Sequence, residues 1–361
     1  MPAHPIIAAD VAAVLSRSRS LWPDLENAAV FITGATGFFG IWLLETLLAA
    51  NREFSLNCRV LGLSRDPARF ARKAHHLATD PAVSWIEADV RDFAFPAGPV
   101  THVIHAATES STTLNADDPQ AMFDVCVEGT RRVLALAREK RPARMLLTSS
   151  GAVYGRQSPE LSHVPDDFTG GPDPLDPRNA YAEGKRAAEH LCAIACLPPP
   201  AGAGLHISIA RCFAFVGPHL PLDIHFAIGN FIRDALAGGP IRVNGDGTPY
   251  RSYLYAADLA EWLFTILLRG RAGRAYNVGS EEAVSIRELA ERVASVAASV
   301  RADGRQPAIE IARQGRPDAS AERYIPSCST AHAAFGCTSC VSLDEAIART
   351  MTFATTARCT S

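Results

Sequence analysis

The stretch Ala29–Ala50 joins a short apolar run to a helical pattern through a turn that contains three glycines. Val30–Thr33 has the β-branched, apolar composition of a buried strand, and the residues after the turn repeat apolar side chains at helical spacing. The glycines that separate the two patterns are Gly34, Gly37 and Gly40. A strand, a tight turn and a helix in this order predict a parallel α/β unit with an anion-binding turn.

Each of the three glycines has a distinct predicted role. Gly34 allows the tight turn off the strand, Gly37 lets a pyrophosphate approach the backbone, and Gly40 allows the helix to pack closely on the sheet. The N–H groups and the positive dipole end of the helix would then face the phosphates. This context favours a dinucleotide site over a plain strand–turn–helix corner.

The segments that follow keep alternating between strand and helix patterns. Strands are expected at Arg59–Ser64, Val83–Ala88, His102–Ala106, Arg144–Ser149 and Leu205–Arg211, and helices are expected after Asp66, after Asp118 and over Ala180–Ala195. This alternation predicts a Rossmann-type doubly wound parallel sheet with helices on both faces. The C-terminal ends of the strands would meet at one edge, where ligands bind.

Changes in pattern divide the chain into predicted domains. Residues 1–26 are expected to form an N-terminal helical extension, in which Asp10 caps a short helix, and residues 27–218 form the dinucleotide-binding domain. The regular alternation ends after this, so residues 219–361 are expected to form mainly a smaller α/β substrate-binding domain. Within it, residues 250–280 are expected to return to the first domain.

The composition excludes several classes of function. Hydrophobic residues make up 48% of the chain and the formal net charge is −3, so no basic field points to nucleic acid or to an anionic membrane surface. No apolar run approaches the roughly 20 residues of a membrane span, and the first residues lack the pattern of a signal peptide. The scattered cysteines, with one isolated Cys337-x-x-Cys340 pair, predict a reduced cytoplasmic protein without a metal site.

Tyr181 and Lys185 form the most informative chemical pair in the chain. Their spacing of four puts both side chains on one helix face, and lysine occurs only at positions 73, 140 and 185. A nearby ammonium favours the ionised form of a phenol, so Tyr181 could exchange a proton with an alcohol or carbonyl oxygen. A surface pair on an amphipathic helix is the alternative. Ser150, at the end of a predicted strand, could bond the same oxygen, although serines there often only form turns.

These residues belong to a longer series of motifs that resembles a known family. From Phe31 to about Asp318 the chain is similar to the extended short-chain dehydrogenases/reductases, the nucleotide-sugar epimerase/dehydratase group. Seven motifs match in the family's order: TGATGFFG (33–40), Asp89-Val90, VIHAA (103–107), SSGAVYG (149–155), YAEGK (181–185), RCFAFVGP (211–218) and NGDGTPYRSYLYAAD (244–258). The resemblance implies a Rossmann domain that binds NAD(P) and a C-terminal domain that binds a nucleoside-diphosphate sugar.

The resemblance also implies roles for individual residues. Tyr181 would be the acid–base residue, Lys185 would bind the nicotinamide ribose and lower the pKa of Tyr181, and Ser150 would polarise the reacting oxygen. The cofactor would contact Gly34, Thr36, Gly37, Phe38, Phe39, Gly40, Ser64, Arg65, Asp89, Val90, Ala106, Ala107 and Lys185. The substrate would contact Ser150, Asn230 (for which helix capping is the alternative), Arg251 and Arg316. Family members commonly form homodimers through the helices that match Asp118–Lys140 and Ala180–Ala195.

Departures from the family's pattern narrow the expected reaction. Its 4,6-dehydratases and sugar decarboxylases carry an acidic residue at the position of Gly151 or Ala152, so those reactions are disfavoured here. Its NAD-specific members carry an acid where this chain has Ser64, which Arg65 follows, and a hydroxyl with a guanidinium suits a 2′-phosphate instead. In the alternative interpretation, Arg65 merely covers the adenine. Cys126 and Ala214 stand where the family's motifs commonly have asparagine, and this affects the finer contacts with the cofactor and the substrate.

We therefore expect NADP(H) as the cofactor, with NAD(H) as the alternative, and no metal. The expected activity is reduction at C4 of a 4-keto sugar nucleotide. A 4-epimerase with tightly bound NAD is the second hypothesis, and a non-catalytic dinucleotide-sensing protein is the third.

Overall fold

The computed structural model describes residues 4–108, 112–223, 226–301, 303–314 and 321–359 of the 361-residue chain. Contacts divide the chain into two compact units, and each is described by itself. The first unit contains Met1–Gly155, Gly171–Cys212 and Ala260–Tyr276, and the second contains Arg156–Gly170, Phe213–Leu259 and Asn277–Ser361. This division places residues 156–170 with the second unit, whereas the sequence analysis put them in the first domain.

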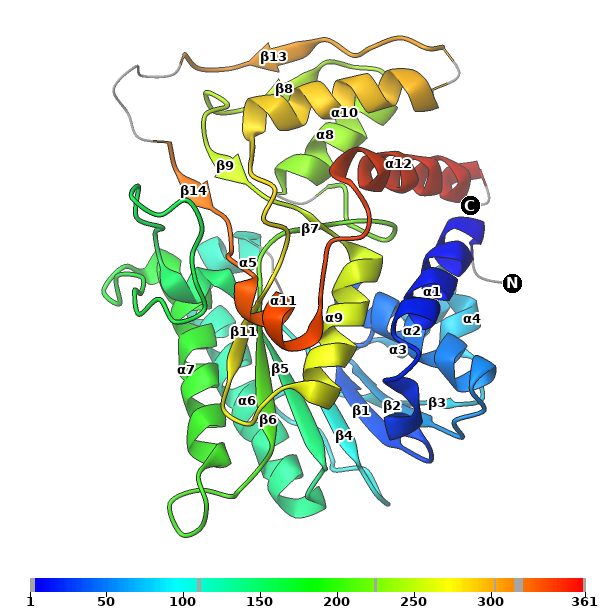
Figure 1. Cartoon of the computed structure of the whole chain (residues 1–361), viewed down its shortest axis with the longest axis vertical. Coiled ribbons are helices and arrows are strands. Elements are labelled where there is room, and N and C mark those ends of the chain that lie inside the picture. Colours follow the sequence, from blue (N-terminus) through cyan, green and yellow to red (C-terminus); the bar gives the residue numbers. More distant parts are fainter. Residues whose placement is uncertain (1–3, 109–111, 224–225, 302, 315–320, 360–361) are drawn as a thin grey trace. The chain divides into compact units, whose positions relative to one another are not determined.

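A seven-stranded sheet forms the centre of the first unit, with the order β11-β6-β5-β4-β1-β2-β3 (Figure 1). The strands are β1 (Ala29–Thr33), β2 (Arg59–Ser64), β3 (Val83–Glu87), β4 (His102–His105), β5 (Arg144–Ser150), β6 (Ile207–Cys212) and β11 (Ala275–Val278). Neighbours from β3 through β6 pair in parallel, and the strand order reverses beside β1, between β1 and β4. The expected doubly wound parallel sheet is confirmed, with its switch point at β1 and β4.

Helices cover this sheet and complete its core. They are α1 (Pro5–Arg17), α2 (Phe38–Glu53), α3 (Pro67–Lys73), α4 (His75–Ala78), α5 (Thr112–Asp117), α6 (Pro119–Lys140), α7 (Ala180–Cys196) and α9 (Ala256–Arg269). All five residues of β1 are buried, as expected for a parallel strand covered on both faces. Helices α6 and α7 pack side by side, and their apolar residues join those of the strands in one buried cluster. This packing holds the C-terminal ends of the strands next to the start of α7.

Local capping explains where several of these helices begin. Asp118 accepts a hydrogen bond from the backbone N–H of Ala121 at 2.9 Å, and Asp66 does the same for Arg69 at 2.7 Å, as the sequence predicted. The prediction for Asp10 is wrong. Helix α1 begins at Pro5, the imidazole of His4 caps it, and Asp10 is a buried residue within the helix. Proline at the first helical position fixes this earlier start.

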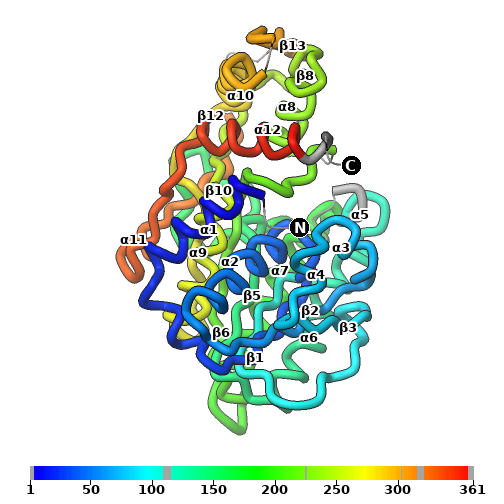
Figure 2. Tube along the Cα trace, turned by 90° about the vertical axis from the view of Figure 1, so that its right-hand side faces the viewer, coloured from blue at the N-terminus to red at the C-terminus, as the bar shows by residue number. Residues whose placement is uncertain are grey.

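The second unit is a smaller α/β assembly (Figure 2). Its helices are α8 (Ala227–Leu236), α10 (Ile286–Val300), α11 (Ser329–Phe335) and α12 (Leu343–Cys359). Its strand groups are β7 (Phe215–Val216) with β10 (Leu254–Tyr255), β8 (Ile241–Val243) with β13 (Ile309–Ile311), and β9 (Tyr250–Arg251) between β12 (Val284–Ser285) and β14 (Arg323–Tyr324). A capping box of Ser285 and Glu288 opens α10. No helix within the described residues combines the length and the apolarity needed to cross a membrane.

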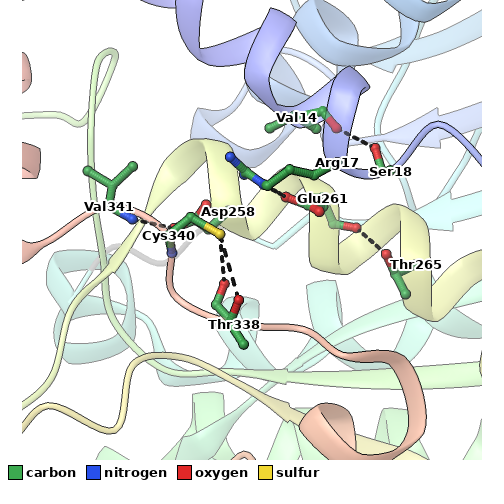
Figure 3. A network of polar contacts seen from close by, with 9 residues as sticks. All are labelled: Val14, Arg17, Ser18, Asp258, Glu261, Thr265, Thr338, Cys340 and Val341. Atoms are coloured by element: carbon green, nitrogen blue, oxygen red, sulfur yellow. Dashed lines mark hydrogen bonds and ion pairs between the residues drawn. The ribbon is translucent and has the colours of Figure 1, made fainter.

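Asp258, the last residue of the long motif 244–258, has a structural role inside the second unit. Its buried carboxylate accepts hydrogen bonds from the backbone N–H groups of Cys340 at 2.8 Å and Val341 at 3.3 Å (Figure 3). These bonds tie the chain that precedes α12 to the first turn of α9. Of the Cys337-x-x-Cys340 pair, Cys337 is buried and Cys340 is exposed. Within the described residues, no three His, Cys, Asp or Glu side chains converge as a metal site requires.

Candidate active site

The turn between β1 and α2 has a shape that side chains at two of its glycines would prevent. Gly34 has a φ of +70°, and a Cβ there would lie 2.6 Å from the carbonyl oxygen of Ala106. A Cβ on Gly40 would lie 2.3 Å from the carbonyl oxygen of Gly34 and 2.4 Å from atoms of Ala35. The closest neighbours of Gly40 are therefore the turn's own backbone, and not the sheet that the sequence analysis expected.

The start of α2 provides what an anion needs. Gly37 is the N-cap residue, and no side chain of this cap bonds the N–H groups of the first turn. Helix α2 has 16 residues, so its aligned peptide dipoles favour negative charge at this end. Thr36 precedes this cap, and Phe38 and Phe39 are the first two residues of α2. The arrangement fits the diphosphate of a dinucleotide.

Gly40→Ala is expected to destabilise the protein by about 1–3 kcal/mol, because the new methyl group overlaps the turn backbone. In an ordinary helix the same change would stabilise by about 1 kcal/mol. Urea unfolding of the purified variant measures the difference. Gly239→Ala is the control, since a Cβ there meets nothing within 4 Å. A Gly40→Ala variant as stable as the parent would contradict this description of the turn.

A buried hydrogen-bonded chain fixes the backbone where β4 ends. The Nδ1 atom of His105 lies 2.8 Å from Thr33 Oγ1, and its Nε2 atom lies 3.0 Å from Thr130 Oγ1. The Thr130 hydroxyl donates to the carbonyl oxygen of Cys126 at 2.7 Å, so His105 donates through Nε2 and accepts through Nδ1. Thr33 Oγ1 also accepts the N–H groups of Ala106 at 3.1 Å and of the following residue at 3.0 Å. This chain orders the two alanines that were predicted to contact the cofactor.

Acid is expected to destabilise the fold through two buried histidines before most carboxylates are protonated. Burial lowers the pKa of His102 to about 4 and that of His105 to about 3. An unfolded histidine has a pKa of about 6.5, so below that pH the unfolded chain binds more protons than the folded chain. The stabilisation is complete above about pH 6.5 and is lost as the pH falls towards the folded values, at up to about 1.4 kcal/mol per pH unit for each histidine.

Urea unfolding at a series of pH values between about 5 and 7 measures this slope. His105→Gln should make the free energy of unfolding depend less steeply on pH, because one fewer histidine takes up a proton on unfolding. His75→Gln is the matched control, because it makes the same change at an exposed histidine. A stability that does not vary with pH over this interval would contradict the prediction.

Tyr181 and Lys185 lie together at the start of α7. Lys185 is 4% exposed, and its Nζ atom lies 5.9 Å from the centre of the Tyr181 ring. Nζ donates to the carbonyl oxygen of Thr148 at 2.7 Å and to Thr108 Oγ1 at 2.8 Å. Burial lowers the pKa of Lys185. An ammonium placed here would favour the ionised phenol of Tyr181.

Ser150 is the last residue of β5, two residues after the carbonyl that binds Lys185. The Ser150 side chain is buried, and its Oγ atom accepts a hydrogen bond from the N–H of Ala152 at 3.1 Å. The serine thus forms a turn, which was one of the two roles that the sequence analysis considered, while its O–H remains a donor. Gly151 and Ala152, which follow it, bring no titratable side chain.

An ion pair that the sequence analysis did not identify connects the middle of α7 to the sheet. Glu189 accepts charge-assisted bonds from Arg211 of β6 at 3.0, 3.2 and 2.7 Å, and a further bond from the hydroxyl of Ser149 at 2.5 Å. Arg211 also donates to the hydroxyl of Tyr154 at 2.9 Å. The network joins α7, β5 and β6 around the strand end that carries Ser150. The spacing of four from Lys185 places Glu189 on the same face of α7, but no local pattern pairs it with Arg211.

A hollow of about 320 Å³ lies at the C-terminal end of β2 in the first unit. It is lined by Thr36, Ser64, Arg65, Asp66, Arg69, Phe70 and Lys73. Ser64 Oγ lies 3.3 Å from Thr36 Oγ1 and accepts the N–H of Asp66 at 3.2 Å. Arg69 and Lys73 were not in the prediction, although their spacing of four within the helix expected after Asp66 would have indicated a shared helix face.

The remaining predicted cofactor residues lie beyond β3. Asp89 is paired with Arg91, whose Nε atom lies 2.8 Å from Asp89 Oδ1, and this hydrogen bond lowers the pKa of Asp89. Val90 is buried, and its side chain lies 2.9 Å from where a Cβ of Gly129 would be, so α6 packs directly on it. Their predicted contact with adenine stays a prediction.

Of the three predicted substrate residues of the second unit, Asn230 and Arg251 lie within the described residues. Asn230 lines a hollow of about 330 Å³, together with Ala227, Phe231, Arg233, Asp234, Arg242, Val243, Asn244, Gly245, Gly247, Pro249 and Ile286. Asn230 lies inside α8, whose N-cap residue is Phe226, so the alternative of helix capping is wrong. Arg251 does not line this hollow and donates to Glu322 at 2.6 Å. Arg316 lies outside the described residues.

Known proteins are similar to this chain in sequence and in fold. Residues 30–279 match the model of the NAD dependent epimerase/dehydratase family. UDP-glucuronic acid decarboxylase 3 of Arabidopsis thaliana is 30% identical over 316 residues, which cover 83% of this chain and 83% of that protein. Decarboxylase 1 of the same plant is 31% identical, and the match spans only 59% of its length.

A solved structure of UDP-glucose 4-epimerase from Thermus thermophilus, in complex with NAD, is also similar. It aligns with a TM-score of 0.71 and 26% identity, over 90% of this chain and 98% of that one.

Proposed function

Because the chain belongs to the NAD dependent epimerase/dehydratase family, within the extended short-chain dehydrogenases/reductases, we propose that it transforms a nucleoside-diphosphate sugar at C4 with a nicotinamide dinucleotide. One observation carries this proposal above the others. A buried ammonium, Lys185, lies beside the phenol of Tyr181 and is bonded to the carbonyl of Thr148 on the strand that ends in Ser150. A phenol with such a neighbour is suited to proton transfer at an oxygen.

The described residues fit a dinucleotide. The turn at Gly34 and Gly37 would hold the diphosphate, Asp89 and Val90 would contact the adenine, and Lys185 would hold the nicotinamide ribose. When bound, the nicotinamide supplies or accepts the hydride. Tyr181 then gives a proton to the sugar oxygen during reduction or takes one during oxidation, and Ser150 hydrogen-bonds that oxygen.

We assign NADP(H) as the preferred form on the charge of the hollow at β2. Arg65, Arg69 and Lys73 line it, and the Ser64 hydroxyl stands where an acid would repel a 2′-phosphate. Asp66 also lines the hollow, and its carboxylate accepts the N–H of Arg69 at 2.7 Å as the cap of α3. Three cations against one carboxylate favour a bound phosphate.

Ser64→Asp is expected to reverse the cofactor preference. The added carboxylate would repel the 2′-phosphate and could accept a hydrogen bond from a ribose hydroxyl, so kcat/KM with NADPH should fall by about 100-fold relative to NADH. Initial rates with each cofactor measure this ratio. Ser64→Ala is the matched control, since it removes the hydroxyl without adding charge. A parent protein that binds NAD more tightly than NADP would overturn the assignment.

The direction of the overall reaction follows from the cofactor. An NADPH that is consumed and replaced fits net reduction of a 4-keto sugar nucleotide, which is our leading proposal. A 4-epimerase is the second candidate, favoured by the 26% identity to the Thermus thermophilus enzyme. Decarboxylation, the activity in the names of the Arabidopsis relatives, is less favoured because neither Gly151 nor Ala152 supplies an acidic side chain after Ser150.

The proposal is tested by supplying purified protein with NADPH and, in separate reactions, a 4-keto sugar nucleotide, UDP-glucose and UDP-glucuronic acid. We expect oxidation of NADPH only with the 4-keto sugar, in a ratio of one to one. Interconversion of UDP-glucose with its C4 epimer would instead support the epimerase. Release of carbon dioxide from UDP-glucuronic acid would support a decarboxylase, and turnover of none of them would contradict the proposal.

A further inference from the structure

The connection between β4 and α6 contacts the catalytic helix α7 at two points, one helical turn apart. Thr108 Oγ1 accepts a hydrogen bond from Lys185 Nζ at 2.8 Å. Asn115 Oδ1, from α5, accepts one from the backbone N–H of Tyr181 at 2.9 Å. We propose that Thr108 and Asn115 are positioning residues for the acid–base pair: Thr108 holds Lys185 as an ammonium, and Asn115 fixes the backbone that carries Tyr181. The catalytic meaning of this rests on the proposed function.

The bonding around Thr108 favours the charged form of the lysine. The Thr108 hydroxyl donates its own hydrogen to the carbonyl oxygen of Ala107 at 2.7 Å, so towards Lys185 it can only accept. The second partner of Lys185, the carbonyl oxygen of Thr148, is also only an acceptor. A neutral amine could donate to both acceptors through its two N–H groups, but its lone pair finds no donor in either of them, and the bonds that a charged ammonium makes to the same acceptors are stronger. These two bonds therefore oppose the burial that disfavours charge.

Asn115 acts as a helix cap supplied from another segment. Tyr181 is the second residue of α7, a position where the backbone N–H usually bonds a group from outside the helix. The residue at the N-cap, Asn179, makes no side-chain cap. Asn115 takes over this bond and donates through Nδ2 to the carbonyl oxygen of Arg178 at 2.8 Å. Its two hydrogen bonds hold the backbone at Arg178, before the helix start, and at Tyr181, within the first turn. Together they fix the position of the Tyr181 backbone.

The role of Thr108 can be tested in the protein without cofactor or substrate. With lysine only at positions 73, 140 and 185, a protein labelled with ¹⁵N-lysine gives few side-chain signals, and Lys185→Met assigns the relevant one. We expect Thr108→Val, which keeps the shape and removes the acceptor, to move the Lys185 titration to lower pH. Thr108→Ser should restore it, and Lys73 and Lys140 should not change. A Thr108→Val titration that superimposes on the parent would overturn this part.

The role of Asn115 is read from amide exchange in the same cofactor-free state. Asn115→Leu should speed exchange of the Tyr181 N–H in a ¹⁵N-tyrosine-labelled protein. Asn115→Asp keeps the acceptor and should leave exchange close to the parent rate. Equal exchange in the parent and both variants would overturn the capping role. These two experiments stand even if no sugar nucleotide is turned over.

Kinetics then connect the two residues to catalysis. Thr108→Val is expected to lower kcat by about 10- to 100-fold, with KM for the sugar nucleotide little changed, and to bring the alkaline loss of activity to lower pH. Thr108→Ser should recover most of the rate. Asn115→Leu should lower kcat more than Asn115→Asp does. Altered titration or exchange with unchanged kcat would show that these contacts are structural only.

Discussion

Tyr181→Phe is expected to lower kcat by about three orders of magnitude while the dissociation constant of the dinucleotide changes little. The variant removes one hydroxyl and leaves the ring beside Lys185, whose own bonds run to Thr108 and Thr148 and do not need the phenol. The loss is thus confined to the proton transfer. Steady-state kinetics and fluorescence titration of the cofactor measure the two quantities separately.

Tyr276→Phe is the matched control for this experiment. It removes a hydroxyl that accepts the N–H of Arg271 at 3.1 Å, within the same unit, and it should leave kcat near the parent value. A Tyr181→Phe variant that keeps its full rate and still binds cofactor would contradict the assignment of Tyr181 as the acid–base residue.

Glu189→Ala is expected to destabilise the fold by about 3 kcal/mol, the largest effect on stability that we predict. The carboxylate accepts both the Arg211 guanidinium and the Ser149 hydroxyl, and both charged side chains are largely buried, at 17% and 12% exposed. Its removal takes away the carboxylate that faces the guanidinium, which also donates to the Tyr154 hydroxyl at 2.9 Å. The loss of the opposite charge from a largely buried ion pair accounts for the destabilisation.

The control for this prediction is an ion pair of the same residue types at the surface. Glu128 lies 3.3 Å from Arg131 on α6, and both side chains are more than half exposed, at 55% and 59%. Glu128→Ala should change the free energy of unfolding by no more than about 0.5 kcal/mol, because water and salt screen the pair. Equal losses in Glu189→Ala and Glu128→Ala, measured by urea unfolding, would contradict the importance assigned to burial.

Features that depend on neighbouring residues were predictable from the sequence. The strand–glycine–helix order at Ala29–Ala50 predicted β1, the turn and α2. The pair Asp118-Pro119 predicted the start of α6. The helical spacing of Tyr181 and Lys185 likewise placed both on α7. In each case the interacting groups lie within a few residues of each other, so a short stretch of sequence is enough to predict the cap or turn.

Features that depend on packing between distant segments were not predictable. Asn115 caps α7 from 66 residues away, and no local pattern connects it with Tyr181. Gly40 is required by the carbonyl oxygen of Gly34, which the fold of the turn brings close, and not by the sheet. Asp10 has the composition of a cap but is buried inside α1, because His4 and Pro5 begin that helix earlier. Tertiary context decided the first case, whereas the other two depended on the geometry of one turn and of one helix start.

The central claim is that hydride passes from NADPH to C4 of a sugar nucleotide while Tyr181 supplies the proton. It is tested most directly with NADPH that carries deuterium at C4 of the nicotinamide ring, prepared separately with the label on each face. Mass spectrometry and NMR of the product locate the label. We predict that NADPH labelled on one face of the nicotinamide transfers one deuterium to C4 of the sugar for each NADPH oxidised. NADPH labelled on the other face should transfer none. A protein that retains tightly bound NAD, exchanges no NADPH and yields an unlabelled C4 epimer would contradict the claim.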